Sequence, residues 1–390
     1  MPDDVPQRLS AYRYLAEHPE IFAAIGETGG DELRLQKALR ARFPDDAVRL
    51  ALSVVDLRAK AARKFPFADR MWFDRARLEQ ATPGAVASHK ARRFKGEVWD
   101  YCCGAGADSI ALAAHASVTA VDSDPIACLL TELNAAALSV SERIRILEQP
   151  VEELRDRSGL LHVDPDRRAG ALKRAVRVED YAPSLETLRG FADSFRGGAI
   201  KVSPAANFGG KFDDVEIEVV SVDGEAKEAT IWFGELAQPD LWRATVLPEG
   251  ATLAGDPLSV EPVLGSLGGY VFDPDPAVVR AGLIDLLCGE TGLRRLDDAE
   301  EYLTADDPVT TPFANGFRVL AEVANNERAI KNALRDLDCG RLEIKARRLP
   351  IEIERLHRTL PTNGDRPLVL LFARIAGKAR AIIAERVDRR

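Results

Sequence analysis

A short glycine-containing loop between a predicted strand and a predicted helix most constrains how this chain can fold. Val98–Tyr101 reads as a short strand, and Asp108–Ala114 reads as a helix. Between them lie Gly104 and Gly106, which allow a tight turn and a close approach of the backbone to a ligand. A strand, a glycine turn and a helix in this order predict the first unit of a doubly wound α/β sheet.

The residues that follow repeat this alternation. The predicted strands are 117–121, 144–147, 159–164 and 198–202, and the predicted helices are 125–137 and 183–191. Strands separated by helices of this length favour right-handed crossovers and a parallel sheet. Two more predicted strands, 215–222 and 228–233, flank the hairpin signal Asp223-Gly224. We therefore expect an α/β fold with a mostly parallel, Rossmann-like sheet that ends in an antiparallel hairpin.

The regions on either side of this pattern predict further domains, because 390 residues are too many for one compact core. Residues 5–62 show helical periodicity, and Thr82-Pro83 predicts an N-cap that starts a helix reaching Arg92. Residues 235–265, rich in Pro and Gly, predict a connector with little structure. A helix at 276–287 follows, and then the helices 325–337 and 350–360 with the strands 341–345, 368–374 and 379–384 predict a small α/β domain. The predicted divisions are a helical region at 1–92, the α/β core at 93–236, a connector with α/β elements at 237–315, and the small domain at 316–390.

Charge is distributed unevenly along the chain. The net charge is −9, but residues 331–390 hold 15 Lys and Arg against 8 Asp and Glu, a net charge of +7, which leaves −16 for the rest. A basic end on an acidic body indicates a polyanionic partner, or else an ordinary solvated surface. Four cations of this end alternate partly on one strand face and could bind phosphates: Arg341, Lys345, Arg347 and Arg348.

Several classes of protein are disfavoured. The longest apolar runs, such as Val369–Ala373, are much shorter than a membrane span, and the N-terminus shows no secretion leader. The five cysteines are unevenly spread, form no CxxC pair and read as reduced thiols. The histidines are scattered, so no metal site is expected. These features predict a cytoplasmic protein with no membrane and no metal partner.

Two acids define the expected ligand. Asp100 precedes the first loop glycine by four residues, and Asp122 ends the next strand, where a carboxylate can accept from both ribose hydroxyls. A dinucleotide is disfavoured because its third glycine position holds Ser109 and because a pyrophosphate beside Asp100 would be repelled. S-adenosylmethionine carries no phosphate, and its amino group can pair with an acid near Gly104.

These motifs also resemble a known family. Asp100–Asp108 and Ala120–Pro125 resemble motifs I and II of class I methyltransferases. Together with Asn134, and with Thr82-Pro83 and His89 upstream, the core is similar to the trimethylguanosine synthase group. Residues 65–390 resemble a bacterial methyltransferase family with a C-terminal THUMP-like domain, a resemblance that Cys339–Lys345 and the final strand pair carry. It implies an S-adenosylmethionine-dependent methyltransferase acting on RNA, such as tRNA or rRNA.

The resemblance also implies a donor site and an acceptor site. The expected donor contacts are Asp100, Tyr101, Cys102, Gly104, Gly106, Asp108, Asp122, Ser123 and Glu148. The expected catalytic residues, at the motif IV position, are Asp164, Pro165, Asp166 and Arg167. Amino-directed methyltransferases place Asp or Asn, two prolines and an aromatic residue there. This chain keeps Asp164-Pro165 but has no ring there, so the resemblance does not by itself imply amine methylation. Arg167 or Arg168 could stack on a base, bind phosphate, or pair with Asp180 or Glu179.

Several residues keep two interpretations. Pro150 stands where an acid usually contacts adenine, so Glu148 or Gln149 could replace that acid. Lys201 reads as an exposed strand-end lysine that could also reach a phosphate. Cys102 and Cys103 read as packing residues, and His89 as a possible substrate contact. For the whole chain, a methyltransferase of a small molecule or protein, or a binding protein without catalysis, remain the alternatives.

Overall fold

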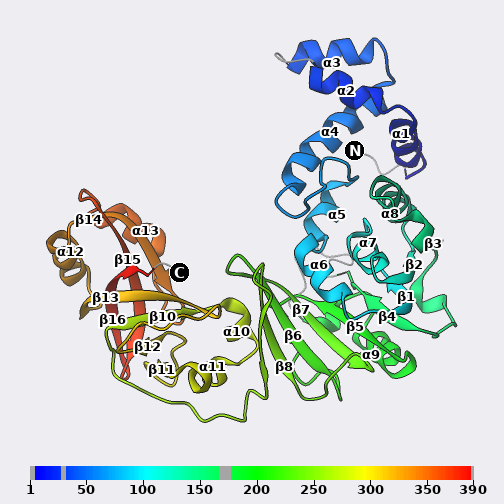
Figure 1. Ribbon diagram of the computed structural model, residues 1–390. Coiled ribbons are helices and arrows are strands. Elements are labelled where there is room, and N and C mark those ends of the chain that lie inside the picture. The colour runs from blue at the N-terminus through cyan, green and yellow to red at the C-terminus, as the bar shows by residue number, and fades with distance from the viewer. Residues whose placement is uncertain (1–4, 28–31, 167–176, 388–390) are drawn as a thin grey trace. The chain divides into compact units, whose positions relative to one another are not determined.

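A computed structural model describes residues 5–27, 32–166 and 177–387 (Figure 1). Its contacts divide the chain into two compact units: Met1–Glu216 with Lys227–Pro239, and Ile217–Ala226 with Asp240–Arg390. None of the helices described has the length and apolar character needed to cross a membrane.

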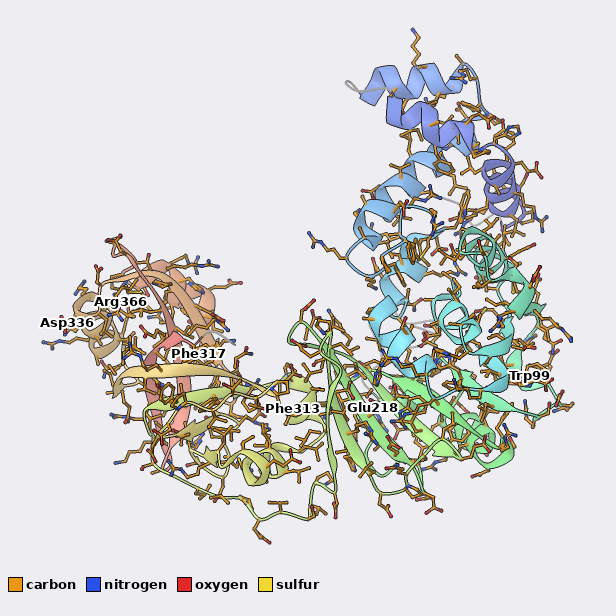
Figure 2. All side chains as sticks on the ribbon, in the orientation of Figure 1. Trp99, Glu218, Phe313, Phe317, Asp336 and Arg366 are labelled. Carbon is orange, nitrogen blue, oxygen red and sulfur yellow. The ribbon has the colours of Figure 1, made fainter. Side chains whose placement is uncertain are left out.

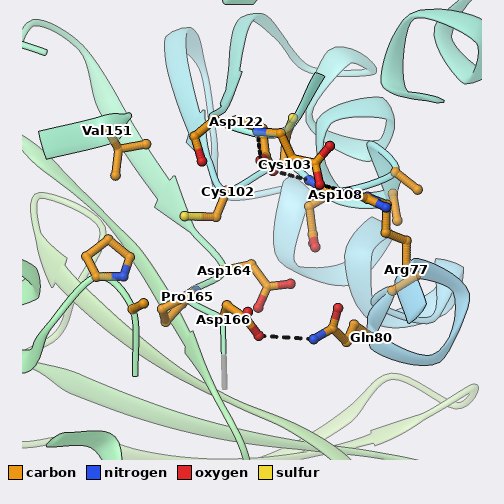
Figure 3. A pocket seen from close by; sticks show the side chains of 18 of the residues that line it. Arg77, Gln80, Cys102, Cys103, Asp108, Asp122, Val151, Asp164, Pro165 and Asp166 are labelled. Atoms are coloured by element: carbon orange, nitrogen blue, oxygen red, sulfur yellow. Dashed lines mark hydrogen bonds and ion pairs between the residues drawn. The ribbon is translucent and has the colours of Figure 1, made fainter. Parts of the chain in front are cut away.

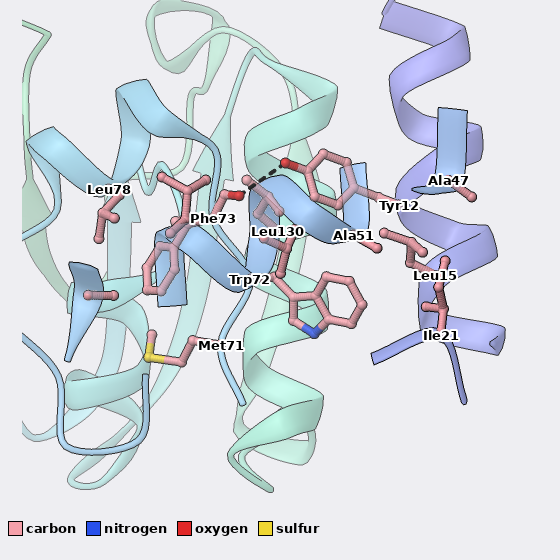
Figure 4. Close-up of a cluster of buried hydrophobic side chains, with 14 of the residues drawn as sticks. Tyr12, Leu15, Ile21, Ala47, Ala51, Met71, Trp72, Phe73, Leu78 and Leu130 are labelled. Carbon is pink, nitrogen blue, oxygen red and sulfur yellow. Dashed lines mark hydrogen bonds between the residues drawn. The ribbon is translucent and has the colours of Figure 1, made fainter. Parts of the chain in front are cut away.

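The N-terminal region is helical, as the periodicity predicts. Its helices are α1 (Val5–Glu17), α2 (Glu20–Glu27), α3 (Glu32–Arg40), α4 (Asp45–Ala61), α5 (Arg75–Gln80) and α6 (Gly84–Ala91). Tyr12 and Leu15 of α1 share one buried apolar cluster with Ala51 of α4 and with Leu130 of α8 in the α/β core (Figure 4). Because burial of this shared surface is the main stabilising term, the helices belong to the same packed unit as the core.

The predicted cap of α6 is wrong by one residue. Pro83, and not Thr82, occupies the N-cap position, and it makes no side-chain cap hydrogen bond. The Thr82 hydroxyl instead donates to the buried Asp108 carboxylate at 2.5 Å. Because the buried Asp108 carboxylate needs hydrogen-bond donors, Thr82 donates to it and does not cap α6.

The α/β core has the expected alternation. Its strands are β1 (Gly96–Tyr101), β2 (Ala116–Asp122), β3 (Ile144–Glu148), β4 (Leu160–Val163) and β5 (Gly197–Val202), and its helices are α7 (Ala107–Ala113), α8 (Pro125–Ala137) and α9 (Leu185–Ser194). All five strands pair in parallel, with Asp100 opposite Ala120 and Asp122 opposite Glu148. The short turns η1 (Ser141–Arg143), η2 (Val151–Glu153) and η3 (Val178–Asp180) lie in the connections. The carboxyl ends of β1 to β4 consequently share one edge of the sheet.

The hairpin signal is also realised. Asp223 and Gly224, both with positive φ, join β6 (Glu216–Val222) to β7 (Glu225–Gly234), as a two-residue hairpin turn requires. β7 pairs antiparallel with β5, with Ile231 opposite Ile200. The strand order of the sheet is β3-β2-β1-β4-β5-β7-β6-β8-β9.

The expectation of a connector with little structure at 235–265 is wrong for residues 242–255. β8 (Trp242–Leu247) pairs in parallel with β6, and β9 (Ala251–Gly255) pairs antiparallel with β8. Ala244, Val246 and Leu253 are buried, so the segment has the alternating apolar face of a strand pair. Pro248 and Gly250 lie in the turn between these two strands, and the sheet extends beyond the expected boundary at 236.

The second sheet is larger than the predicted C-terminal domain. Its strand order is β11-β12-β10-β13-β16-β15-β14. The strands are β10 (Tyr270–Pro274), β11 (Arg294–Arg295), β12 (Leu303–Ala305), β13 (Ala314–Ala324), β14 (Cys339–Ala346), β15 (Arg366–Ile375) and β16 (Lys378–Arg386). Phe317 of β13 is fully buried in its core (Figure 2). Three strands therefore come from 270–305, and β13 begins before residue 316.

The helices of this second unit also differ in one place from the expectation. The predicted helix 276–287 is two helices, α10 (Pro276–Arg280) and α11 (Ile284–Thr291), because Gly282 turns the chain at a φ of +72°. The helices α12 (Glu327–Asp336) and α13 (Ile353–Thr359) follow the prediction closely. Asn326 caps α12, since its side chain accepts from the Ala329 N–H at 2.9 Å.

We expect Gly198→Ala to destabilise the protein by about 1–3 kcal/mol or more, because overpacking a core is costly. A Cβ at this position in β5 would lie 2.0 Å from the Leu161 carbonyl oxygen and 2.7 Å from the Phe233 ring. Urea unfolding measures the change. Gly190→Ala in α9 is the matched control: nothing lies within 4 Å of its Cβ position, so it should raise stability by about 0.5–1 kcal/mol. Equal stability of the two variants would contradict this account.

Candidate functional site

A cavity of about 540 Å³ lies at the carboxyl edge of the parallel strands (Figure 3). Loops that follow β1 to β4 line it together with the end of α5, where they supply Cys102, Gly104, Asp122, Val151 and Asp164. Ligands of doubly wound sheets bind at this edge, so the cavity lies where the sequence predicts the site.

The two loop glycines have different roles. Gly104 has a φ of +59°, lines the cavity, and has open space where a Cβ would stand. Gly106 has a φ of +78°, but its Cβ would lie 2.9 Å from the Thr131 side chain of α8, and it does not line the cavity. Gly104 therefore leaves room for a ligand, whereas Gly106 lets α7 pack against α8.

Asp122 lies at the end of β2 and orders the loops on both sides. Its carboxylate accepts from the backbone N–H groups of Gly104 and Asp124, both at 3.0 Å. Burial raises the pKa of Asp122, although these two donors oppose the shift. Ser123 also lines the cavity, as predicted. Each oxygen of Asp122 uses one of its lone pairs in these bonds and can accept another hydrogen bond.

Asp100 and Tyr101 lie beneath the loop and do not line the cavity. The Asp100 carboxylate lies 2.7 Å from Nδ1 of His162 and accepts a hydrogen bond from Ser109. The Tyr101 hydroxyl accepts from Arg157 at 2.9 Å, and its ring packs edge-on against Phe191. These two residues support the loop from below instead of facing the cavity space.

The loop after β3 provides a residue that the sequence analysis missed. Glu148 is exposed at the strand end and lies outside the cavity lining, whereas Pro150, Val151 and Glu152 line it. The turn η2, which begins directly after Pro150, brings Val151 and Glu152 to the cavity. Pro150, followed after Val151 by the acids Glu152 and Glu153, could have indicated this short turn, but not that it faces the cavity.

The motif IV residues gather on the opposite side of the glycine loop. Asp164, Pro165 and Asp166 line the cavity, and Arg167 and Arg168 lie outside the described residues. Asp166 accepts from the Gln80 amide at 3.1 Å. Asp164 is partly exposed, with 27% of its side chain accessible, and Lys201 lies beside it.

Lys201 is not the exposed lysine that the sequence suggested. It is only 8% exposed, and its ammonium donates to Asp164 at 2.6 Å, to the Thr82 hydroxyl at 2.7 Å and to the Gln80 carbonyl at 3.4 Å. Periodicity could not reveal this, because all three partners come from other elements. Burial raises the pKa of Asp164, and the Lys201 charge opposes that shift.

A second buried ion cluster lies directly behind the cavity wall. Lys90 of α6 lies 3.0 Å from Asp108 of α7 and donates to Glu228 of β7 at 2.7 Å. Burial by itself would raise the pKa of Asp108, but Lys90 together with His162, Lys201 and the Thr82 hydrogen bond outweighs burial and holds that pKa below its ordinary value. Asp108 also accepts from Thr82, so the cluster joins the contacts around Lys201. Asp108 thus lines the cavity and anchors the core.

The helical N-terminal region forms part of the site. Ala76, Arg77, Gln80, Ala81 and Thr82 line the cavity. The Arg77 guanidinium, which is labelled in Figure 3, donates to Asp74 and to Asp124 and so connects α5 with the start of α8. The only sequence signal for this wall is Thr82-Pro83, because nothing local in α5 marks it as part of a site.

The remaining candidates from the sequence are Cys102, Cys103 and His89. Burial raises the pKa of both Cys102 and Cys103 well above the ordinary value, so these thiols are poor nucleophiles at neutral pH. His89 does not line the cavity. Among the described residues that line the cavity, acids outnumber cations, because Arg77 is the one cation. The acids are Asp108, Asp122, Asp124, Glu152, Asp164 and Asp166.

The predicted phosphate-binding set of the second unit is largely ion-paired. Lys345 and Arg347 bind Asp273 at 3.0 and 2.7 Å, and Arg348 binds Glu301 at 2.6 Å. Arg341 of the same set is exposed and forms no ion pair with the residues that the structure describes. Three of the four predicted cations are therefore neutralised by acids of their own unit.

Comparison with known families gives two matches. Residues 95–178 match the family described as RNA cap guanine-N2 methyltransferase, and residues 314–386 match the family described as THUMP domain-like. The first range covers β1 to β4 with the glycine loop, and the second covers β13 to β16.

Comparison with individual proteins extends over most of the chain. It is 34% identical over 355 residues to an uncharacterized S-adenosylmethionine-dependent methyltransferase of Mycobacterium tuberculosis, found in strains CDC 1551 / Oshkosh and ATCC 25618 / H37Rv. The match covers 86% of this chain and 95% of that protein. A crystal structure of a candidate methyltransferase from Porphyromonas gingivalis W83 has the same fold, with a TM-score of 0.73, 19% identity, and coverage of 95% and 99% of the two chains.

We expect Lys90→Met to destabilise the protein by about 3–5 kcal/mol at pH 7, because it leaves Asp108 and Glu228 as buried unpaired charges. In the wild type the lowered pKa of Asp108 gives stability that is present above the unfolded carboxyl value of about 4 and is lost as pH falls through the folded value. In the variant the pKa of Asp108 should rise, so the deficit should shrink as the pH falls from 7 towards 4.

Urea unfolding at pH 7 and at about pH 4.5 tests this. Lys60→Met removes an exposed 2.7 Å pair with Asp56 and is the control; it should cost at most about 1 kcal/mol at either pH. A deficit for Lys90→Met that grows as the pH falls would contradict the assignment.

Proposed function

Because this chain belongs to the S-adenosylmethionine-dependent methyltransferases, we propose that the cavity binds this donor and that the methyl group is transferred to a nucleotide of RNA, in tRNA or rRNA. The observation that carries the proposal is the acidic cavity beside Gly104, which has Asp122 on one side and Asp164 on the other. The match at 95–178 supports RNA as the acceptor, since that family is described as an RNA cap methyltransferase. The match at 314–386 supports it as well, because the family is described as similar to THUMP domains, which are associated with RNA.

The residues present fit the donor. The open space at Gly104 admits it, and Asp122 retains acceptor capacity for two ribose hydroxyls. The excess of acids in the lining favours a cationic sulfonium and disfavours a pyrophosphate. We assign donor contacts to Cys102, Gly104, Asp108, Asp122 and Ser123, and we add Glu152 in place of Glu148. Asp100, Tyr101 and Gly106 then act by shaping the loop.

The bound donor supplies a methyl group that is activated by its sulfonium. The protein's part is alignment: Asp164 and the Pro165 backbone orient the acceptor, and the cavity walls limit its approach. Asp166, held by Gln80, completes the acceptor side. We keep Arg167 as a proposed contact to the RNA.

We assign RNA capture to the C-terminal domain, which we place at 316–390 together with the strands of 270–305 that complete its sheet. The cations available to phosphates are those without internal partners, such as Arg328 and Arg335 of α12 and Arg341 of β14, which are exposed and unpaired among the described residues.

The reduced state of the five cysteines is compatible with the cytoplasm, where we place the protein.

One observation favours a second candidate function. Because Lys345, Arg347 and Arg348 are paired with acids, the basic domain could be a scaffold, and the acceptor could be a small molecule or a protein. Such an enzyme would use the same donor site and would show no affinity for RNA.

Asp122→Ala should weaken the binding of S-adenosylhomocysteine by about 10- to 100-fold, because it removes the ribose acceptor and frees two loop N–H groups. Isothermal titration with S-adenosylmethionine, S-adenosylhomocysteine and NAD measures this, and NAD should not bind. Asp156→Ala, an exposed acid outside the cavity, is the control and should bind as the wild type does. Wild-type affinity in Asp122→Ala would remove Asp122 from the donor site.

Bulk tRNA or rRNA should become labelled by the wild-type protein with tritiated S-adenosylmethionine. Exchanging both Arg328 and Arg335 for Glu should lower RNA affinity and reduce the slope of log affinity against log salt by about 0.9 for each lost phosphate contact. Arg145→Glu, which reverses an exposed charge on β3, is the control. RNA that is neither bound nor labelled by the wild type would favour the second candidate function.

A further inference from the structure

Lys201 is the buried ion that the proposed mechanism does not yet use. It lies near the end of β5, one position before Val202, and comes within hydrogen-bond distance of three acceptors. An ammonium has three N–H donors and no acceptor. The Asp164 carboxylate, the Thr82 hydroxyl and the Gln80 carbonyl match these donors one to one. Such complete pairing fixes the orientation of all three partners.

The Thr82 hydroxyl shows how rigidly the group is held. Its oxygen accepts from Lys201 at 2.7 Å, so its own hydrogen is directed to Asp108 at 2.5 Å. Asp108 is in turn held by Lys90. Lys201 is consequently anchored in the buried ion cluster, while Asp164 forms the end of this chain of contacts at the cavity.

Asp164 is the member of the chain that a substrate can reach. One carboxylate oxygen, Oδ2, accepts from Lys201, and the side chain retains 27% of its exposure in the cavity lining. The charged groups that act on it are Lys201 from β5, Asp108 from α7 and Lys90 from α6. Burial and Asp108 favour the neutral carboxyl, and the two lysines favour the carboxylate. Without Lys201, a partly buried carboxyl beside Asp108 would take up a proton more readily.

We propose that Lys201 is a positioning residue that holds Asp164 as an oriented carboxylate, and that the acceptor atom is therefore one that carries a hydrogen, an amine nitrogen or a hydroxyl oxygen. This inference rests on the proposed function. The acceptor atom bonds to the methyl carbon while the carbon–sulfur bond breaks, and the electron pair of that bond stays on sulfur. The proton released from the acceptor passes to the Asp164 carboxylate and then to water.

The test compares Lys201→Met, Lys201→Gln and Lys201→Arg with Lys211→Met. Lys211 is the control, because it is a partly buried lysine that is also paired with a carboxylate, Glu179, and it lies outside the cavity lining. Lys201→Gln keeps hydrogen-bond donors without the charge, so it serves if Lys201→Met does not fold. Isothermal titration with S-adenosylhomocysteine should show affinities within about threefold of the wild type for all folded variants.

Transfer of tritiated methyl groups to bulk tRNA and rRNA is the second readout. The uncharged variants should lose about 10²-fold or more in kcat, with the acid limb of the rate profile moved to higher pH, and Lys201→Arg should restore that limb. The third readout needs no acceptor: in ¹³C NMR, the Asp164 carboxyl, identified by its loss in Asp164→Asn, should titrate about 1–3 units higher in the uncharged variants.

The outcomes separate this inference from the proposed function. Unchanged kcat with an unmoved Asp164 titration in the Lys201 variants overturns the role of Lys201. If the wild type labels neither RNA, the RNA proposal fails, and the Asp164 titration still decides whether Lys201 sets the state of this carboxylate. Equal losses in Lys211→Met would show a general effect of charge and would also overturn the inference.

Discussion

The buried contact among Lys90, Asp108 and Glu228 is the interaction on which the rest of the first unit depends. It joins α6, α7 and β7, which are distant in sequence, through charges that are stable in the interior only when all are present. Asp108 also forms part of the cavity wall. The core and the site are therefore held by the same set of contacts, so the wall cannot shift without exposing an unpaired charge.

A series of polar contacts connects this cluster with the Asp164 side of the cavity. Thr82 and Lys201 connect Asp108 with Asp164, and Gln80 connects the end of α5 with Asp166. On the other side of the glycine loop, Asp122 holds Gly104 and Asp124 by their backbone groups. The expected donor side is built mainly on backbone donors, and the expected acceptor side on side-chain ions. This division suits a donor of fixed structure and an acceptor that must lose a proton.

The sequence predicted the parts of the fold that local patterns determine. The βα alternation, the hairpin at Asp223-Gly224 and the helix that begins at Pro125 all follow from turn residues and apolar periodicity, and the structure contains them. It did not predict β8 and β9, because their strand signal is short and lies among Pro and Gly. The cavity lining was predictable where a motif fixes the backbone, as at Gly104 and Asp122. Lys201 was interpreted as an exposed strand-end lysine, and Glu152 and Arg77 were not proposed, because their positions in the site depend on segments brought together only by the tertiary fold.

The path of the chain between the two units has a consequence for the order of folding. The first unit is left at Glu216 and entered again at Lys227, and the returning strand β7 both pairs with β5 and carries Glu228. A ribosome that has made only residues 1–216 has produced every residue of the cavity, but β5 still lacks its outer neighbour and Lys90 lacks one of its two carboxylates. Lys90 and Asp108 then form a one-to-one ion pair, and both the second carboxylate of the cluster and the outer neighbour of β5 come from a strand that follows the cavity residues in sequence. The cavity residues are therefore synthesised before the strand that completes their sheet.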